Sequence, residues 1–351
     1  MFSEFGGDAI LIYNTAMVDS NFIYMSGFTS GIFEHTALLV TKNKMVLLTS
    51  ELEYQTALSQ KPKEMKVVKY SGVEELGRHL GKLLDGAVVG VDMEFLPYGY
   101  FRKLKRLSRA KKFVDASKAF SKARLVKDDK EIKCIQKAVD IVKHTFNGIE
   151  SIFRASMTEK MLAAEFDNRM RINGAAEPSF KTIVAFGKNA ALPHHAPDDT
   201  KLGANEFVLI DAGARFNNYC SDLTRTFIFK PDKSSRKYKD MKQMIDIVKE
   251  AQKLALDAVK PGADGMKAHK AAEDHINAAN GGVYRGKFIH SLGHSIGIDV
   301  HDGGARLSGY SHSKLGKGMV FSDEPGIYIT GFGGVRFEDD LLVTEGGARL
   351  L

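Results

Sequence analysis

The chain has 351 residues, of which 44% are hydrophobic and 26% charged, a composition typical of a globular protein long enough for two domains. No apolar run has the length of a membrane-spanning segment, and the sequence begins without the basic stretch and cleavage site of a signal peptide. Its two cysteines, Cys134 and Cys220, form no disulfide framework and are typical of a reducing compartment. We therefore expect a cytoplasmic protein that does not bind a membrane.

Part of the net charge of +7 is concentrated in FRKLKRLSRAKKF, residues 101–113. Such a run can bind nucleic acid, or it can be the solvated face of a helix whose apolar side carries Leu104 and Leu107. No zinc-finger, RNP or aromatic-interleaved pattern accompanies it. We interpret the run as a helix surface and expect no nucleic-acid partner.

Residues 1–123 alternate short apolar runs with helical stretches, which predicts a small α/β domain. The expected strands are 8–13, 36–41, 45–49, 66–70 and 87–92, and the expected helices are 74–84 and 100–112. The domain contains no phosphate loop and no metal-spaced His/Cys cluster. It therefore has no predicted chemistry of its own.

Residues 124–351 form the second predicted domain. An apolar stripe from Ile132 to Phe153 predicts one long helix, and a second helix follows from Thr158 to Gly174. The order of two helices followed by strands then recurs, with helices at 234–262 and 264–282 and strands at 287–292, 318–324 and 334–344. This repeat predicts an α+β domain with a pseudo-two-fold arrangement around one curved antiparallel sheet, and a site at the seam between its halves.

The stretch FVLIDAGARFNNYCSDLTRTFIF, residues 207–229, predicts a β-hairpin that carries two acids. If the turn centres between Phe216 and Asn217, Asp211 lies directly opposite Asp222, with β-carbons about 5 Å apart. Two facing carboxylates repel each other unless a divalent cation lies between them. The pair therefore indicates a metal site, although a single Asp in such a turn would be an ordinary cap.

Three later stretches supply further potential ligands. They contain His290, His294 and His301; Asp323 and Glu324; and Glu338, Asp339 and Asp340. The hairpin pair with one histidine and two glutamates would provide enough oxygen and nitrogen ligands for two cations, which can together activate a water for hydrolysis.

A competing motif is Gly293-His294-Ser295-Ile296-Gly297, which fits the nucleophile elbow of serine hydrolases. An elbow is followed by a helix, whereas the residues that follow here are rich in glycine and lack helical periodicity. The only later histidine is His312, in a polar stretch. We therefore retain a serine hydrolase only as a remote alternative.

Five stretches of residues 124–351 together resemble the pita-bread metallopeptidases, the family of prolidase, aminopeptidase P, methionine aminopeptidase and creatinase. In chain order they are AEPSFKTIVAFGKNAALPHHAP, IDAGARFNNYCSDLTRTF, HSLGHSIGIDVH, DEPGIYI and GGVRFEDDLLVT. NFIYMSGF, in the first domain, is similar to the creatinase/prolidase N-terminal domain. The resemblance implies a pita-bread fold for the second domain and a hydrolytic centre with two divalent cations.

The resemblance also implies a role for individual residues. The implied metal ligands are Asp211, Asp222, His294, Glu324 and Glu338. Asp222 and Glu338 would bridge the two cations, Asp211 would hold one, and His294 with Glu324 would hold the other.

Four further residues have implied roles around the metals. Glu324 would also shuttle a proton, and His194 and His301 would stabilise the developing oxyanion, with His195 an ambiguous neighbour of His194. Arg336 would orient the ligand Glu338. Arg306 would bind the carboxylate of a dipeptide substrate.

The two-domain layout and the EPGIYI and GVRFEDD motifs resemble the Xaa-Pro group of the family, which implies hydrolysis of the bond before proline. The favoured reading is an Xaa-Pro dipeptidase (prolidase) that acts as a homodimer on proline-containing dipeptides. The alternatives are an aminopeptidase P for longer peptides and a binding protein that has lost catalysis. Mn²⁺ or Co²⁺ suits the ligands best, with Zn²⁺ or Fe²⁺ as alternatives.

Two residues depart from the family pattern. Ser295 stands where many relatives have glycine, and Asp323 stands where an apolar residue or threonine is usual. The first change affects a close backbone approach. The second adds a carboxylate beside Glu324, with a predicted effect on metal preference.

Overall fold

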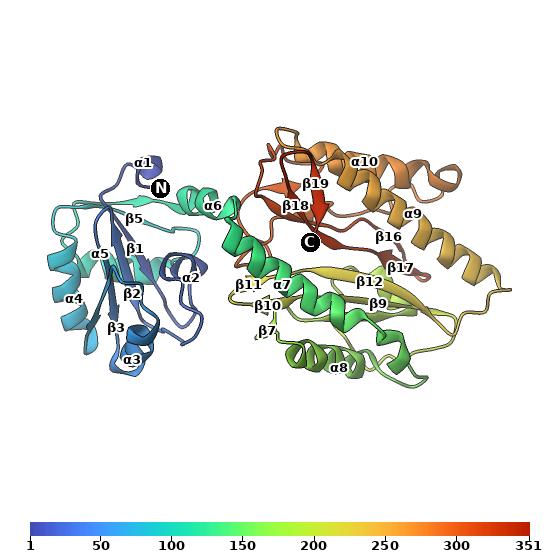
Figure 1. Cartoon of the computed structure of the whole chain (residues 1–351), viewed down its shortest axis with the longest axis horizontal. Helices are drawn as coiled ribbons and strands as arrows, with labels where there is room; N and C mark the ends of the chain where they lie inside the picture. Colours follow the sequence, from blue (N-terminus) through green and yellow to red (C-terminus); the bar gives the residue numbers. More distant parts are fainter. The chain divides into compact units, whose positions relative to one another are not determined.

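The computed structural model describes residues 1–351, which form two compact units, Met1–Arg124 and Leu125–Leu351. Each unit has its own sheets and helices, labelled in Figure 1. None of the helices combines the length and apolar character that crossing a membrane requires.

The first unit is a six-stranded mixed sheet with the order β4-β3-β2-β1-β5-β6. Its strands are β1 (Ala9–Tyr13), β2 (Ala37–Thr41), β3 (Met45–Thr49), β4 (Met65–Lys69), β5 (Val88–Val91) and β6 (Lys112–Asp115). All five residues of β1 are buried. Ala9, Leu11 and Tyr13 pack into one apolar cluster and Ile10 and Ile12 into another, because successive side chains point to opposite faces of a strand.

The helices of the first unit are α1 (Phe2–Phe5), α2 (Ser20–Ser26), α3 (Glu51–Gln60), α4 (Gly72–Leu83), α5 (Tyr98–Leu107) and α6 (Ser117–Leu125). All five expected strands are present. The basic run, however, is not helical to residue 112: α5 ends at Leu107, and Lys112 begins β6. Helices α1, α2, α3 and α6 and strand β6 were not predicted.

The first half of the second unit contains two helices and two three-stranded antiparallel sheets, β11-β10-β7 and β12-β9-β8. The helices are α7 (Asp129–Phe146) and α8 (Glu159–Ile172), with 3₁₀ turns η1 (Ile149–Ile152) and η2 (Gly187–Ala191). The strands are β7 (Glu177–Pro178), β8 (Ile183–Phe186), β9 (Glu206–Ala212), β10 (Ala214–Phe216), β11 (Tyr219–Cys220) and β12 (Leu223–Phe229). Asp128 and Glu131 form a capping box that starts α7, and Thr158 caps α8.

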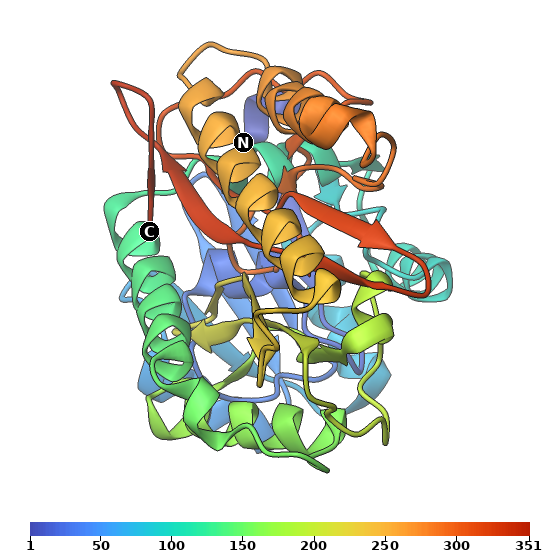
Figure 2. The same ribbon diagram turned by 90° about the vertical axis from the view of Figure 1, so that its right-hand side faces the viewer.

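The second half repeats the order of two helices and then strands. The helices are α9 (Arg236–Ala258) and α10 (Gly265–Ala278), with η3 (Ala279–Gly282). The strands are β13 (Gly293–His294), β14 (Arg306–Leu307), β15 (Val320–Asp323), β16 (Gly326–Ile329), β17 (Gly333–Arg336), β18 (Asp339–Val343) and β19 (Ala348–Leu350). In Figure 2 the green helices α7 and α8 accompany the yellow strands, and the gold helix α9 lies along the red ones.

The hairpin register differs from the predicted one by two residues. Thr224, not Asp222, lies opposite Asp211, because the turn is centred between Asn217 and Asn218. Both asparagines have positive φ, 46° and 71°, the backbone of a tight two-residue hairpin turn. A shift of two residues preserves the face of the sheet. Asp211 and Asp222 are therefore diagonal neighbours on one face.

Three other predicted boundaries are wrong. The helix from Ile132 ends at Phe146, where Gly148 with a φ of 74° interrupts the stripe, so Phe153 lies outside it. Residues 287–292 form no strand. Residues 334–344 form two strands, β17 and β18, separated by Phe337 and Glu338. The curved sheet accordingly consists of short ladders, two of which are joined by the bridge between Thr224 and Glu338.

Helix α8 offers a direct test of packing in the second unit. Phe166 is fully buried, and its ring centroid lies 4.8 Å from that of Phe146. We expect Phe166→Ala to lower the free energy of unfolding by about 3–5 kcal/mol, through lost burial and the cavity left behind. Urea titration followed by circular dichroism measures this change.

The matched control on the same helix is Ile172→Ala, since the Ile172 side chain is 75% exposed. This variant should stay within about 0.5 kcal/mol of the wild type. Equal losses in the two variants would contradict the packing described for α8.

Candidate metal centre

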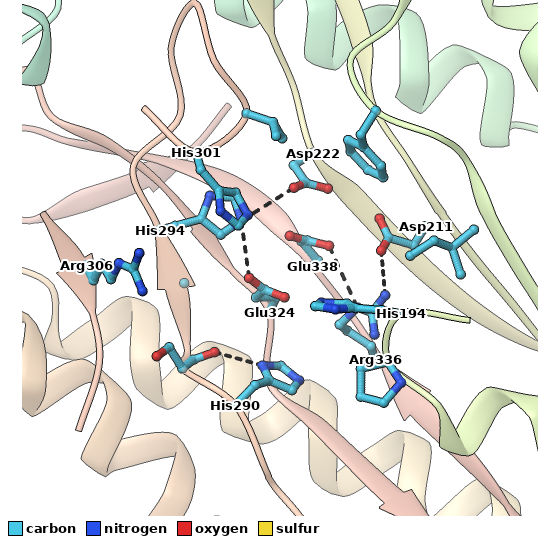
Figure 3. Close-up of a pocket in the computed structure, with 16 residues that line it drawn as sticks. His194, Asp211, Asp222, His290, His294, His301, Arg306, Glu324, Arg336 and Glu338 are labelled. Atoms are coloured by element: carbon cyan, nitrogen blue, oxygen red, sulfur yellow. Dashed lines mark hydrogen bonds and ion pairs between the residues drawn. The ribbon is translucent and has the colours of Figure 1, made fainter. Parts of the chain in front are cut away.

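A cavity of about 450 Å³ lies in the second unit, and both acidic and basic side chains line it (Figure 3). All nine residues predicted for the site line it. They are His194, Asp211, Asp222, His294, His301, Arg306, Glu324, Arg336 and Glu338. The cavity thus brings together side chains that are up to 144 positions apart in the sequence, from His194 to Glu338.

Backbone pairing delivers the acids to the cavity. Asp211 belongs to β9, and Asp222 directly precedes β12. The amide of Glu338 donates to the Thr224 carbonyl at 3.1 Å, which fixes this residue against the hairpin. The amide of Glu324, just after β15, donates to the Leu292 carbonyl at 2.9 Å. Strand pairing therefore holds the four carboxylates from two halves of the unit.

His294 lies between two of these acids. Its Nε2 atom is 3.6 Å from Asp222 Oδ2 and 3.5 Å from Glu324 Oε1, as the dashed lines of Figure 3 mark. Ligand atoms of Asp222, His294 and Glu338 all lie within 4.8 Å of one another. Such spacing suits a shared cation, because each atom needs to approach a metal to only about 2–2.3 Å.

Among the residues that line the cavity, three buried carboxylate oxygens have no hydrogen-bond partner: Asp211 Oδ1, Asp222 Oδ1 and Glu338 Oε1. The second oxygens of Asp211 and Glu338 are satisfied, by Arg336 at 2.5 Å and Thr224 at 2.6 Å respectively. Each of these two acids is thus oriented through one oxygen and leaves the other available. A buried carboxylate oxygen without a partner is unfavourable. The donor set therefore fits divalent cations.

The pKa shifts of the buried acids and of His294 also favour metal binding at this site. Burial, and then the charge of Glu338, raise the pKa of Asp222 well above its usual value. Burial, followed by Glu324, does the same to the pKa of Glu338. Burial raises the pKa of Glu324 to about 8, against an opposing effect of Arg336. Burial, with His301 nearby, lowers the pKa of His294 to about 3. Crowded acids next to a neutral imidazole form a metal-binding combination.

Arg336 is the buried cation of the site. Its guanidinium donates to Asp211 Oδ2 at 2.5 Å, Thr224 Oγ1 at 3.0 Å and the Tyr328 hydroxyl at 2.9 Å. Its Nε atom is 4.0 Å from Glu338 Oε2. The closest acid is therefore Asp211 rather than Glu338, the residue that the sequence suggested it would orient.

His194 and His195, the two adjacent histidines of ALPHHAP, have different neighbours. His194 lines the cavity. His195 instead pairs through Nε2 with Glu159 Oε2 at 2.7 Å. The buried Glu159 carboxylate also accepts from Asn189 Nδ2 and from the backbone amides of Phe186 and Asp198, at 2.8–3.0 Å. Glu159, His195 and Asp198 are close enough to bind a cation, but four donors already occupy the oxygens of Glu159.

His290 also lines the cavity, although the sequence suggested no role for it beyond a potential ligand. Its Nδ1 faces the Ser291 carbonyl and its Nε2 the Tyr328 hydroxyl, each at 2.8 Å. Tyr328 connects it in turn to Arg336. Tyr328, in DEPGIYI, was missed because an alternating strand pattern does not reveal which hydroxyl reaches a buried arginine.

The positions of Ser295 and Asp323 answer two questions that the sequence raised. Ser295 is buried, does not line the cavity, and forms a β-bridge that is followed by bends and not by a helix. It therefore lacks the setting of a nucleophile elbow. Asp323 is buried with both carboxylate oxygens unpartnered and, unlike Glu324, does not line the cavity.

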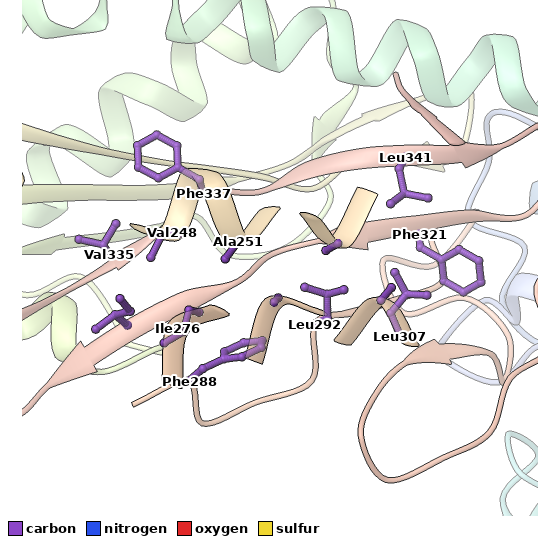
Figure 4. Close-up of a cluster of buried hydrophobic side chains, with 14 of the residues drawn as sticks. Val248, Ala251, Ile276, Phe288, Leu292, Leu307, Phe321, Val335, Phe337 and Leu341 are labelled. Carbon is purple, nitrogen blue, oxygen red and sulfur yellow. The ribbon is translucent and has the colours of Figure 1, made fainter. Parts of the chain in front are cut away.

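An apolar layer supports these strands from behind (Figure 4). Val248 and Ala251 of α9 pack in one cluster with Phe321 of β15, Val335 of β17 and Leu341 of β18. Helix α9 contacts β15, β16 and β17. The strands that carry Glu324 and Arg336 are thus fixed by close packing on one side, while their polar side chains reach the cavity.

The chain matches two protein families. Residues 2–126 match the Creatinase/Prolidase N-terminal domain, and residues 133–345 match metallopeptidase family M24. Among curated proteins, an Xaa-Pro dipeptidase of Pyrococcus horikoshii is 34% identical over 345 residues, which are 98% of this chain and 92% of the relative.

Solved structures are similar over nearly the whole chain. The prolidase from Pyrococcus furiosus is 32% identical with a TM-score of 0.86, covering 99% of this chain and 97% of that one. An X-Pro aminopeptidase from Thermotoga maritima is 32% identical with a TM-score of 0.89, covering 99% and 96%. The fold is therefore the pita-bread fold preceded by a creatinase-type domain, and the chain belongs to metallopeptidase family M24.

Proposed function

We propose that this chain is a metal-dependent Xaa-Pro dipeptidase, which hydrolyses the peptide bond before a C-terminal proline. The observation that carries the proposal is the set of buried carboxylate oxygens without partners, on Asp211, Asp222 and Glu338, in one cavity with His294. The substrate class follows from similarity to an Xaa-Pro dipeptidase and to a prolidase over almost the full chain.

The proposed ligands of two divalent cations are Asp211, Asp222, His294, Glu324 and Glu338. When bound, the cations supply Lewis acidity, which polarises the scissile carbonyl and lowers the pKa of an attacking water. Four carboxylates and one imidazole favour Mn²⁺ or Co²⁺, with Zn²⁺ or Fe²⁺ as alternatives.

The remaining steps are assigned to side chains of the cavity. Glu324, which lines the cavity, takes a proton from the water and delivers it to the leaving imino nitrogen. His194 and His301 donate hydrogen bonds to the oxyanion that develops on the scissile carbonyl. Arg336 holds Asp211 in place through its 2.5 Å contact.

Arg306 is the proposed binding group for the carboxylate of a dipeptide. It lines the cavity, its side chain is exposed, and its backbone pairs with His294 across the β13–β14 ladder. A guanidinium at a cavity mouth is well suited to hold a free carboxylate. Such a contact would favour dipeptides, whose carboxylate lies one residue beyond the scissile bond.

The second candidate function is an aminopeptidase P, which removes the residue before proline from longer peptides. The observation in its favour is the structural similarity to an X-Pro aminopeptidase, with a TM-score of 0.89. The two functions share the metal centre and differ in what lies beyond the proline.

We further propose that residues 124–351 form the catalytic domain and that residues 1–123 mediate a homodimer. In the first unit, Met93, Leu96, Tyr98 and Phe101 line an apolar pocket, and Tyr98 is 72% exposed. These residues support an association surface there.

The proposed location of the protein is the cytoplasm. The unpaired thiols of Cys134 and Cys220 support a reducing compartment. Recovery of the protein from the extracellular fraction of cells would contradict this location.

Metal removal tests the proposed centre. Chelated protein should hydrolyse no Ala-Pro, and Mn²⁺ or Co²⁺ should restore hydrolysis at two equivalents per chain. Because the folded site binds the ions, a concentration of 100 times Kd should also stabilise the protein by about 2.7 kcal/mol for each ion bound. Activity assays, calorimetric titration and thermal melts measure these effects. Full activity in the chelated protein would contradict the proposal.

The substitution Arg306→Ala tests substrate length. We expect kcat/KM for Ala-Pro to fall about tenfold, the loss of one charge-assisted contact. Hydrolysis of Ala-Pro-Ala should change much less, because its carboxylate lies one residue farther away. The control is Arg285→Ala, which removes another exposed arginine. If both substrates lose activity equally, or if the wild type prefers Ala-Pro-Ala, the aminopeptidase function is favoured.

The dimer is tested by sedimentation equilibrium. We expect the wild type to sediment as two copies and Tyr98→Asp to shift toward one, because a charge would enter the apolar surface. A wild type that is monomeric at micromolar concentration would rule out this surface as a dimer contact.

A further inference from the structure

A buried ion pair lies behind the histidines of the cavity. Lys127 Nζ is 3.1 Å from Asp302 Oδ2, and the two side chains are 0% and 1% exposed. The ammonium also donates to Ser295 Oγ at 3.2 Å and to the Leu125 carbonyl at 3.4 Å. Charges buried this deeply are stable only when they are paired and hydrogen-bonded. The pair is thus a built feature of the unit rather than a surface contact.

The pair holds the loop that connects two histidines of the cavity. Ser295 directly follows His294, and Asp302 directly follows His301. The amide of Asp302 donates to the Ser295 carbonyl at 2.8 Å, which closes the loop. The centroids of the two imidazole rings lie 3.9 Å apart (Figure 3). Lys127 therefore joins both ends of the segment that carries these rings.

Gly297 shows how closely the carboxylate fits under this loop. A β-carbon at position 297 would lie 2.0 Å from Asp302 Oδ2, a distance that no side chain allows. The amide of Gly297 donates to the Asp299 carbonyl at 3.0 Å. The loop is thus folded tightly over the buried charge.

The Ser295 carbonyl connects the loop to the imidazole ring of His294. His294 Nδ1 faces that carbonyl at 3.5 Å. A proton on Nδ1 would let the ring donate to this carbonyl and would leave the Nε2 lone pair toward Asp222 and Glu324. The carbonyl thus lies where it supports the tautomer that a metal ligand needs.

We propose that Lys127, Asp302 and Ser295 form a buried clamp that positions His294 for metal binding and His301 for contact with the substrate. The three are positioning residues, since none of them lines the cavity. The catalytic part of this inference rests on the proposed function, whereas the metal-binding part does not.

Two backbone contacts tie the clamp to the rest of the site. The amide of Lys127 donates to the Gly318 carbonyl at 2.9 Å. Ser295 forms a β-bridge with Phe321 of β15, the strand that leads to Glu324. The serine hydroxyl, which a glycine at this position would lack, gives Lys127 an acceptor. The clamp thus accounts for one of the two departures from the family pattern.

The test compares three variants of the full chain. Lys127→Met keeps the length of the side chain and removes its charge, Lys127→Arg keeps the charge, and Ser295→Ala removes one acceptor with little change in volume. The first readout is the Kd for Co²⁺, measured by calorimetric titration of the chelated protein. We expect this Kd to rise about 10- to 100-fold in Lys127→Met, the usual effect of losing a partner behind a metal ligand.

Ser295→Ala should raise the same Kd less, and Lys127→Arg should stay closer to the wild type. The second readout is the hydrolysis of Ala-Pro at saturating Co²⁺. We expect kcat to fall about 10- to 100-fold in Lys127→Met, because misplacing His301 affects the transition state. KM should change little, since the clamp does not touch the substrate.

A destabilised control separates positioning from general loss of stability. Leu162→Ala empties a fully buried position in α8, so it should lower Tm without changing the Kd for Co²⁺ or kcat. Unchanged Kd and kcat in both Lys127→Met and Ser295→Ala would overturn the clamp. If Lys127→Met fails to fold, the Kd for Co²⁺ and the kcat of Ser295→Ala alone decide whether the clamp exists.

The two proposals can fail separately. If the metal-loaded wild type cleaves no Xaa-Pro substrate, the proposed function fails, and the Kd values still decide the clamp. If Ser295→Ala abolishes hydrolysis at every metal concentration while its Kd for Co²⁺ stays that of the wild type, Ser295 acts as a nucleophile and the clamp is overturned.

Discussion

The crowding of buried carboxylates around one cavity is the constraint on which the rest of the site depends. Asp211, Asp222 and Glu338 are all buried, and like charges at such distances strongly disfavour joint ionisation. Arg336 supplies one positive charge to balance these carboxylates. Its guanidinium pairs mainly with Asp211. Each of these three acids also has one oxygen without a hydrogen-bond partner. Only further positive charge, as protons or as metal ions, makes this arrangement stable, and metal ions use all of those oxygens at once.

Such a site also needs a rigid framework, since repelling groups move apart when they can. The acids are therefore carried by paired strands and fixed by short bonds such as that from Thr224 to Glu338, 2.6 Å. The strands rest on an apolar cluster that includes Phe321 and Val335. Rigidity of this kind keeps ligand oxygens close before a metal arrives, which lowers the free-energy cost of organising the site.

The sequence predicted the residues of the site more accurately than it predicted element boundaries and strand register. Apolar periodicity located the helices that begin near Ile132 and Thr158, because one face of each is buried. It could not locate the end at Phe146, which depends on the left-handed backbone of Gly148. The hairpin register was wrong by two residues, yet both acids remained on one face, since strand side chains alternate with a period of two. Residue identity thus determined the site more reliably than exact pairing did.

Contacts between residues that are far apart in the sequence could not be predicted from it. The resemblance assigned His194 to the substrate side and left His195 an ambiguous neighbour. The buried carboxylate of Glu159, 36 positions before His195, shows where His195 belongs. Lys127 and Asp302 are 175 positions apart, so no local pattern could pair them. Sequence motifs identify groups that do chemistry, because these recur in a recognisable order. The groups that orient them are joined by tertiary contacts, which a motif does not contain.

Asp323 illustrates how strand geometry limits what a neighbouring residue can do. Its position beside Glu324 suggested an additional carboxylate at the metals. Successive side chains of an extended segment point to opposite faces, and Asp323, unlike Glu324, does not line the cavity. On its own side it meets Asp339, its partner in the β15–β18 ladder. Burial, followed by the charge of Asp339, raises the pKa of Asp323 well above its usual value. Asp323 is therefore not among the side chains that line the proposed metal centre.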